Sequence, residues 1–125
     1  MARIYDLVPR AVGPFQGYDI VTRAVFGLIL ERYKISQYKF AGDPTGRAWY
    51  DPEREEIYWI YTQEQLAEEV GCSVRTVQRA TNRLREDGLL GVRKADFKGA
   101  CRYSIPSAVY VLFKPQRKTD DAGSQ

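Results

Sequence analysis

Two helix-start signals with a glycine between them restrict the fold of this chain more than any other feature. The four residues from Thr62 to Gln65 have the form of a capping box, in which both side chains satisfy free backbone amides at a helix start. Gly71 suits the left-handed conformation that ends a helix. Ser73 then offers a second N-cap only two residues later. The pattern predicts two consecutive helices joined by a tight turn.

The apolar residues of this segment fit a helix-turn-helix. We expect a first helix over 63–70 and a second from 74 to about 87, with buried residues Leu66, Ala67, Val70, Val77, Ala80 and Leu84. Ala67 is small where the two helices would cross, and Val77 falls beneath the second helix. An arbitrary helical hairpin need not meet these conditions, so the spacing indicates a helix-turn-helix.

The rest of the chain supplies the other parts of a winged helix. Apolar periodicity predicts a helix over 19–36, and β-branched and aromatic residues predict a strand over 56–61. Strands over 89–94 and 101–105 form a hairpin, the wing. We predict an α+β, mostly α, fold: helix, strand, helix, helix and a β-hairpin wing.

Three boundaries follow from the turn signals and the polar ends. Residues 1–17 are expected to be an extended arm, 18–114 the winged-helix domain, and 115–125 a polar, flexible tail or linker. Residues 39–54 hold two proline turns and are expected to be a long surface loop. The apolar run 108–113 fits either a last strand or a short helix.

The exposed face of the second helix carries side chains that suit base edges in a major groove. Arginine can bind guanine with two hydrogen bonds, glutamine and asparagine can pair with adenine, and valine can contact the thymine methyl group. The candidates for base contacts are Val74, Arg75, Gln78, Arg79 and Asn82. The candidates for phosphate contacts are Ser73, Thr76, Arg83 and Arg85, and on the wing Arg93, Lys94, Lys98 and Arg102.

The distribution of charge supports a polyanionic partner. Residues 73–102 contain eight basic and three acidic side chains, a formal charge of +5, whereas the whole chain carries only +3. The excess positive charge therefore lies entirely on the second helix and the wing. A solvated charged surface would not be concentrated in this way, so we expect double-stranded DNA as the partner.

Several function classes are excluded or disfavoured by residue types. The chain has no histidine, so the commonest general base and the commonest metal ligand are missing. Its two cysteines, Cys72 and Cys101, form no C-x-x-C pair. We therefore predict no catalysis, no metal and no other cofactor. The start of the chain lacks a signal peptide and no apolar run could span a bilayer, so we expect no membrane and a cytoplasmic protein.

The order of these elements resembles a known family. The segment 22–36, Trp49 with Asp51, the aromatic strand 57–62 and the helix-turn-helix 62–89 resemble the RepA_N plasmid replication initiators. The first helix and the strand carry the more specific part of this resemblance. It implies a winged-helix domain that binds repeats at a plasmid origin. It further implies that replisome components would be contacted through a separate C-terminal domain, which this chain does not include.

Other functions remain open from the sequence. A transcription regulator would use the same DNA contacts, and a protein-interaction module could use the same helix. A nicking initiator would need the metal-binding histidines that are missing. A homodimer is compatible with either DNA-binding function.

Overall fold

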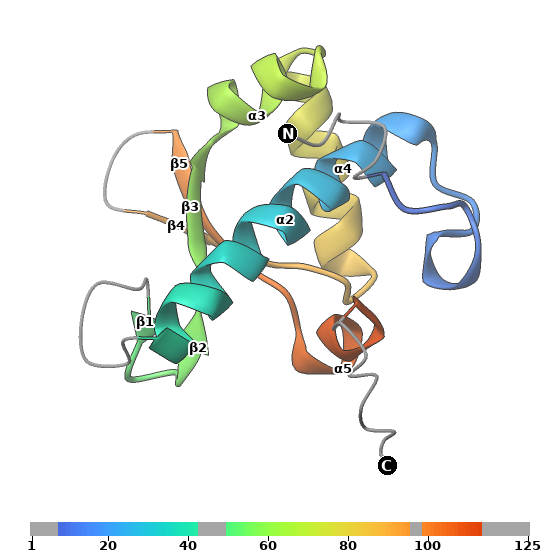
Figure 1. Cartoon of the computed structure of the whole chain (residues 1–125). Helices are drawn as coiled ribbons and strands as arrows, with labels where there is room; N and C mark the ends of the chain where they lie inside the picture. Colours follow the sequence, from blue (N-terminus) through green and yellow to red (C-terminus); the bar gives the residue numbers. More distant parts are fainter. Residues whose placement is uncertain (1–7, 43–49, 96–98, 114–125) are drawn as a thin grey trace.

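The computed structural model describes residues 8–42, 50–95 and 99–113. The helix α2 (Ile20–Gly42) runs diagonally through the molecule in Figure 1. It contacts the helices α3 (Gln63–Val70) and α4 (Val74–Glu86) and strands of both antiparallel sheets. Every residue from Ala24 to Leu30 is buried. The ring of Phe26 in α2 packs against two other aromatic rings. Its centroid lies 4.9 Å from that of Phe15 and 5.7 Å from that of Phe113. Because α2 is covered from several sides, even the polar Thr22 is buried.

The same helix continues beyond its predicted end at Ser36. Ser36 is buried, and no residue up to Phe40 interrupts the helix. The ring of Phe40 stacks on Tyr50 at 4.6 Å, so the last turn has a partner. The helix therefore includes the first residues of the predicted surface loop.

The remainder of that predicted loop is also partly structured. β1 (Tyr50–Asp51) and β2 (Glu56–Ile57) form a short antiparallel hairpin. Asp51 Oδ1 accepts hydrogen bonds from the backbone N–H groups of Glu53 and Arg54, which closes the turn. The expectation of a loop over 39–54 was therefore wrong at both ends, and residues 43–49 lie outside the described part.

The predicted strand over 56–61 is divided between two sheets. Its first residues form β2, and β3 (Trp59–Thr62) joins a second sheet in the order β3-β5-β4. The wing consists of β4 (Gly91–Lys94) and β5 (Ala100–Ser104), antiparallel as predicted. β4 begins two residues later than expected, because Leu89 and Leu90 are buried in the core.

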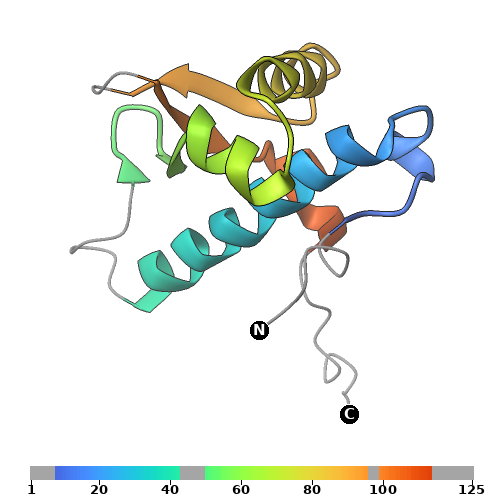
Figure 2. The ribbon, with the colours of Figure 1, turned by 90° about the horizontal axis from the view of Figure 1, so that it is seen from above.

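The helix-turn-helix matches its predicted caps. α3 (Gln63–Val70) begins at a complete capping box, and Gly71 ends it with φ 87°. α4 (Val74–Glu86) begins at Ser73, whose Oγ accepts the backbone N–H of Thr76 at 3.1 Å. In Figure 2, α4 and the β4–β5 wing lie together at the top of the view, and α2 runs below them.

The segment before α2 is more ordered than an extended arm. The 3₁₀ helix η1 (Gly13–Phe15) places Phe15 in the core, where only 4% of it is exposed. The arm prediction was wrong for this part, because an aromatic side chain holds it against α2; residues 1–7 lie outside the described part. The apolar run 108–113 proves helical, as α5 (Ser107–Tyr110) and η2 (Val111–Phe113).

Candidate nucleic-acid interface

The two faces of α4 separate the core from the predicted base-reading residues. Val77, Ala80 and Leu84 are buried as predicted, against α2 and α3. Thr81 is buried as well, which the sequence did not reveal, and its hydroxyl donates to the carbonyl oxygen of Gln78 at 3.2 Å. The opposite face exposes the predicted base-reading residues Arg75, Gln78, Arg79 and Asn82.

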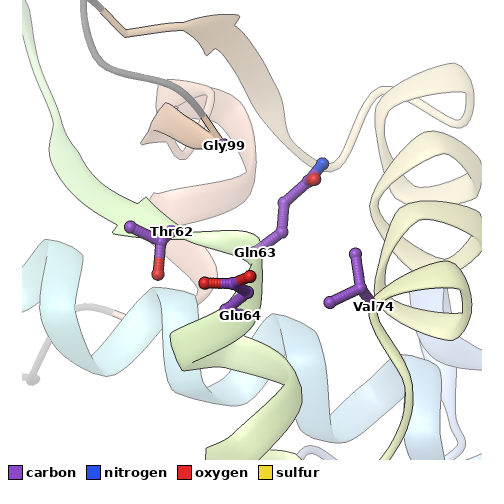
Figure 3. A pocket seen from close by; sticks show the side chains of 5 residues that line it. All are labelled: Thr62, Gln63, Glu64, Val74 and Gly99. Atoms are coloured by element: carbon purple, nitrogen blue, oxygen red, sulfur yellow. The ribbon is translucent and has the colours of Figure 1, made fainter.

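One flank of α4 faces the wing and the start of α3. Val74 is half-buried there and lines a hollow of about 350 Å³ together with Thr62, Gln63, Glu64 and Gly99 (Figure 3). Gln78 donates from Nε2 to Oε1 of Gln63 at 3.0 Å. Sequence reasoning missed Gln63, because it lies on α3, outside the helix from which the contacts were predicted.

The other flank of α4 faces the segment before α2. The guanidinium of Arg83 lies over the ring of Tyr18, 4.5 Å from its centroid, and forms an ion pair with Asp87 at 4.0 Å. At the start of the helix, the hydroxyl groups of Ser73 and Thr76 are 3.0 Å apart. The predicted phosphate-contacting residues Ser73, Thr76 and Arg83 therefore already have partners within the protein.

Three arginines of α4 extend into solvent without such partners. Within the described ranges, the side chains of Arg75, Arg79 and Arg85 make no hydrogen bond or ion pair, and all three are exposed. Among the residues that the structure describes, no carboxylate pairs with these cations. They are therefore available to a polyanion or to base edges.

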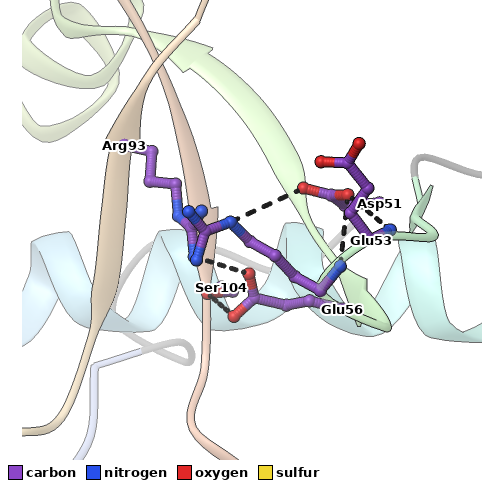
Figure 4. A network of polar contacts seen from close by, with 6 residues as sticks. Asp51, Glu53, Glu56, Arg93 and Ser104 are labelled. Atoms are coloured by element: carbon purple, nitrogen blue, oxygen red, sulfur yellow. Dashed lines mark hydrogen bonds and ion pairs between the residues drawn. The ribbon is translucent and has the colours of Figure 1, made fainter.

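The predicted wing cations that the structure describes have different surroundings. Arg93 Nη2 lies 3.4 Å from Glu56 Oε1, and Glu56 Oε2 accepts a hydrogen bond from Ser104 at 3.0 Å (Figure 4). Arg102 of β5 stands opposite Arg93 of β4 in the strand register. Its guanidinium lies 4.7 Å from the ring centroid of Tyr58.

Lys94 differs from these two arginines. It follows Arg93 in the strand, so its side chain points to the other face of the wing. It is exposed and makes no ion pair with the described residues. Lys98 lies outside the described part of the chain, so Lys94 is the described wing cation most available to a partner.

Two further properties concern other classes of function. Within the described ranges, no three side chains of histidine, cysteine, aspartate or glutamate gather closely enough to hold a metal ion. Across the same ranges, none of the helices has both the length and the apolar character needed to cross a bilayer.

Comparison with known proteins agrees with the fold. Residues 38–90 match a family described as "Helix-turn-helix domain". A search among curated proteins gives no match.

Solved structures resemble the whole arrangement. A structure titled "N-Terminal domain of DNA binding protein" is 15% identical, with a TM-score of 0.55 over 94% of this chain and 86% of that one. "Structure of Rep-DNA complex" is 17% identical, with a TM-score of 0.54 over 86% and 83%. "Structure of MDR initiator" is 16% identical, with a TM-score of 0.53 over 88% and 81%. At these identities the likeness establishes the fold. The chain thus contains a DNA-binding helix-turn-helix within a winged-helix fold like that of the Rep–DNA complex and of the MDR initiator.

Proposed function

We propose that this chain binds double-stranded DNA in a sequence-specific manner, with α4 in the major groove. The observation that carries the proposal is the exposed row Arg75, Arg79 and Asn82, opposite the buried face of α4. Arginine and asparagine side chains match guanine and adenine edges there. Gln78 and Val74 extend the same surface toward the wing.

Phosphate contacts would position the helix on the duplex. Arg85 and Lys94 are exposed, and Arg83 is about half exposed despite its contact with Tyr18. The hydroxyl groups of Ser73 and Thr76 stand at the amino end of α4, where backbone amides favour anions. Cations at these places would release counterions from DNA and make binding depend on salt.

We further propose that the target is a repeated site at a plasmid replication origin. The resemblance of the first helix and the aromatic strand to RepA_N initiators supports this role. The likeness in fold to a Rep–DNA complex and to an initiator agrees with it. Two copies could then occupy neighbouring repeats as a homodimer, and contacts with replisome components would require a further domain.

Selection of bound duplexes from a random pool tests the proposal. The selected sequence should recur as direct repeats within or near the gene for this chain, and affinity should fall steeply with salt. A single selected site beside a promoter would instead support transcription regulation. Recovery of no preferred duplex, with binding insensitive to salt, would refute DNA recognition and favour a protein partner.

A further inference from the structure

Gln63, the first residue of α3, connects three parts of the proposed DNA-binding surface. Its backbone N–H donates to the carbonyl oxygen of Gly99, in the connection between the two strands of the wing, at 2.9 Å. Its side-chain Oε1 accepts a hydrogen bond from Gln78 Nε2 on α4. Figure 3 shows the Gln63 side chain extending between Gly99 of the wing and Val74 of α4. Gln63 is therefore beside the base-reading helix without belonging to it.

In the orientation that the Gln63 amide has in the structure, its bond to Gln78 determines which end of the Gln78 amide is free. Oε1 of Gln63 can only accept, so the amino group of Gln78 must face it. When Gln63 takes the N–H that lies anti to Oε1, Gln78 keeps its Oε1 and the N–H on the same side of the amide. This acceptor–donor pair matches N6 and N7 of adenine in the major groove. With the Gln78 amide alone reversed, its Oε1 would face Gln63 Oε1, a second acceptor, and no hydrogen bond would join them.

A base edge fits this corner of the protein better than a phosphate does. Glu64 also lines the hollow beside Gln63, and its carboxylate would repel a phosphate group. An amide already held in place also loses less rotational freedom when DNA binds. Both features favour recognition of a base through hydrogen bonds.

We propose that Gln63 is a specificity-determining residue, which orients Gln78 to read an adenine. The inference rests on the proposed function, since it requires α4 to lie in the major groove. It adds to that function a residue from α3 and names the base that Gln78 selects. In this role Gln63 is a positioning residue that acts through Gln78.

The test measures base preference at the position that Gln78 reads. Loss of preference in Gln78→Ala identifies that position in the selected duplex, and dissociation constants are then measured with each of the four bases there. Gln63→Met removes the acceptor while keeping the length of the side chain. It should lower the preference for adenine about five- to tenfold at that position only. In Gln78→Ala it should have almost no further effect, because the two residues act together.

Two variants separate positioning from charge. Gln63→Glu retains an acceptor and can hold only the proposed orientation of Gln78, so adenine should still be preferred although overall affinity falls. Glu64→Gln removes a charge from the same helix end without contacting Gln78, so affinity should rise for all duplexes and preference should not change. Thermal unfolding of each variant verifies that the fold is retained.

The outcomes distinguish this inference from the proposed function. A wild-type chain without base preference would overturn both. A selective wild-type chain would overturn only the inference if Gln63→Met kept its adenine preference, if Gln63→Glu lost it to the same degree as Gln63→Met, or if the base read by Gln78 were not adenine.

Discussion

Tyr18 donates a hydrogen bond from its hydroxyl group to Oδ2 of Asp87, so the segment before α2 is fixed to the C-cap residue of α4. These residues are 69 positions apart in the sequence. The ring of Tyr18 also lies against the guanidinium of Arg83. The end of α4 is therefore held by a residue that precedes the helix-turn-helix.

Replacing Tyr18 with phenylalanine should lower the free energy of unfolding modestly. The ring stays in the core and beneath Arg83, but Asp87 loses a hydrogen bond and, being about half exposed, regains water. We expect the free energy of unfolding to fall by about 1 kcal/mol, measured by urea denaturation. Tyr38→Phe is the matched control, because Tyr38 is 82% exposed. Equal stability of the two variants would show that the bond to Asp87 contributes nothing.

Stability should decrease at alkaline pH because of buried tyrosines. Burial and the bond to Asp87 raise the pKa of Tyr18 to about 12, and burial raises the pKa of Tyr61 to about 12 although a hydrogen bond from Arg32 opposes this. The unfolded chain releases these hydroxyl protons near pH 10.0 and the folded chain releases them near pH 12. Between these two pH values the unfolded state therefore binds fewer protons than the folded state. The contribution of these protonated tyrosines to the free energy of unfolding is fully present below pH 10.0 and is lost as the pH rises toward 12.

Urea midpoints measured across this range, together with tyrosinate absorbance, examine this expectation. The midpoint should fall steadily above pH 10.0, and the fall should be shallower in Tyr18→Phe. A midpoint that stays constant up to pH 12 would contradict it.

Arg79→Ala should reduce both affinity and selectivity. Arg79 is exposed in the middle of the open face of α4 and has no partner within the described residues, so it is placed to reach a base edge. Its loss should reduce the free energy of binding to the preferred duplex by about 1–3 kcal/mol and relax the preference at one base position, where we expect a guanine. Binding titrations with base-substituted duplexes measure both effects.

Arg54→Ala provides the control for the change in charge. Arg54 belongs to the β1–β2 turn, where it pairs with Asp51, so its removal should leave base preference unaltered. If Arg79→Ala resembled this control, the face assigned to DNA would be incorrect.

On the wing, Lys94→Ala and Arg93→Ala should differ in their effect on salt dependence. Lys94 is exposed, whereas Arg93 is engaged by Glu56. Loss of Lys94 should reduce the slope of log affinity against log salt by about one unit, and loss of Arg93 should reduce it less. Titrations at several salt concentrations give both slopes. A larger reduction for Arg93→Ala would place the other face of the wing on the DNA.

Gly91→Ala should destabilise the fold through a single contact. A Cβ atom at this position would collide with the hydroxyl oxygen of Ser104, the same group that donates to Glu56. Overpacking of this kind costs about 1–3 kcal/mol, measurable by urea unfolding. In a Ser104→Ala background the same substitution should cost far less, because the colliding oxygen is gone. An equal cost in both backgrounds would mean that the backbone of β4 is responsible.

The parts of the fold that depend on local chemistry could be predicted from the sequence. The capping box at Thr62, the left-handed Gly71 and the cap at Ser73 each use residues within four positions of one another, so the helix-turn-helix was correctly placed. The exposed row on α4 followed from the same helical period. These features need no information from distant segments.

The errors arose where distant residues decide the structure. Phe40 extends α2 by stacking on Tyr50, and Phe15 anchors the predicted arm against Phe26. Charge counting placed Arg93 and Lys94 together, but strand alternation and Glu56 separate them. Gln63 was missed because its bond to Gln78 joins two helices, and no pattern within one helix reveals it.

The division of α4 into two faces also has a consequence for how such a protein can change its target. Val77, Ala80 and Leu84 hold the helix in place, whereas Arg75, Arg79 and Asn82 contribute almost nothing to the core. Substitutions at the second set can therefore accumulate without unfolding the chain. A library varied at these three positions, with the buried residues unchanged, should yield stable proteins directed to different duplexes.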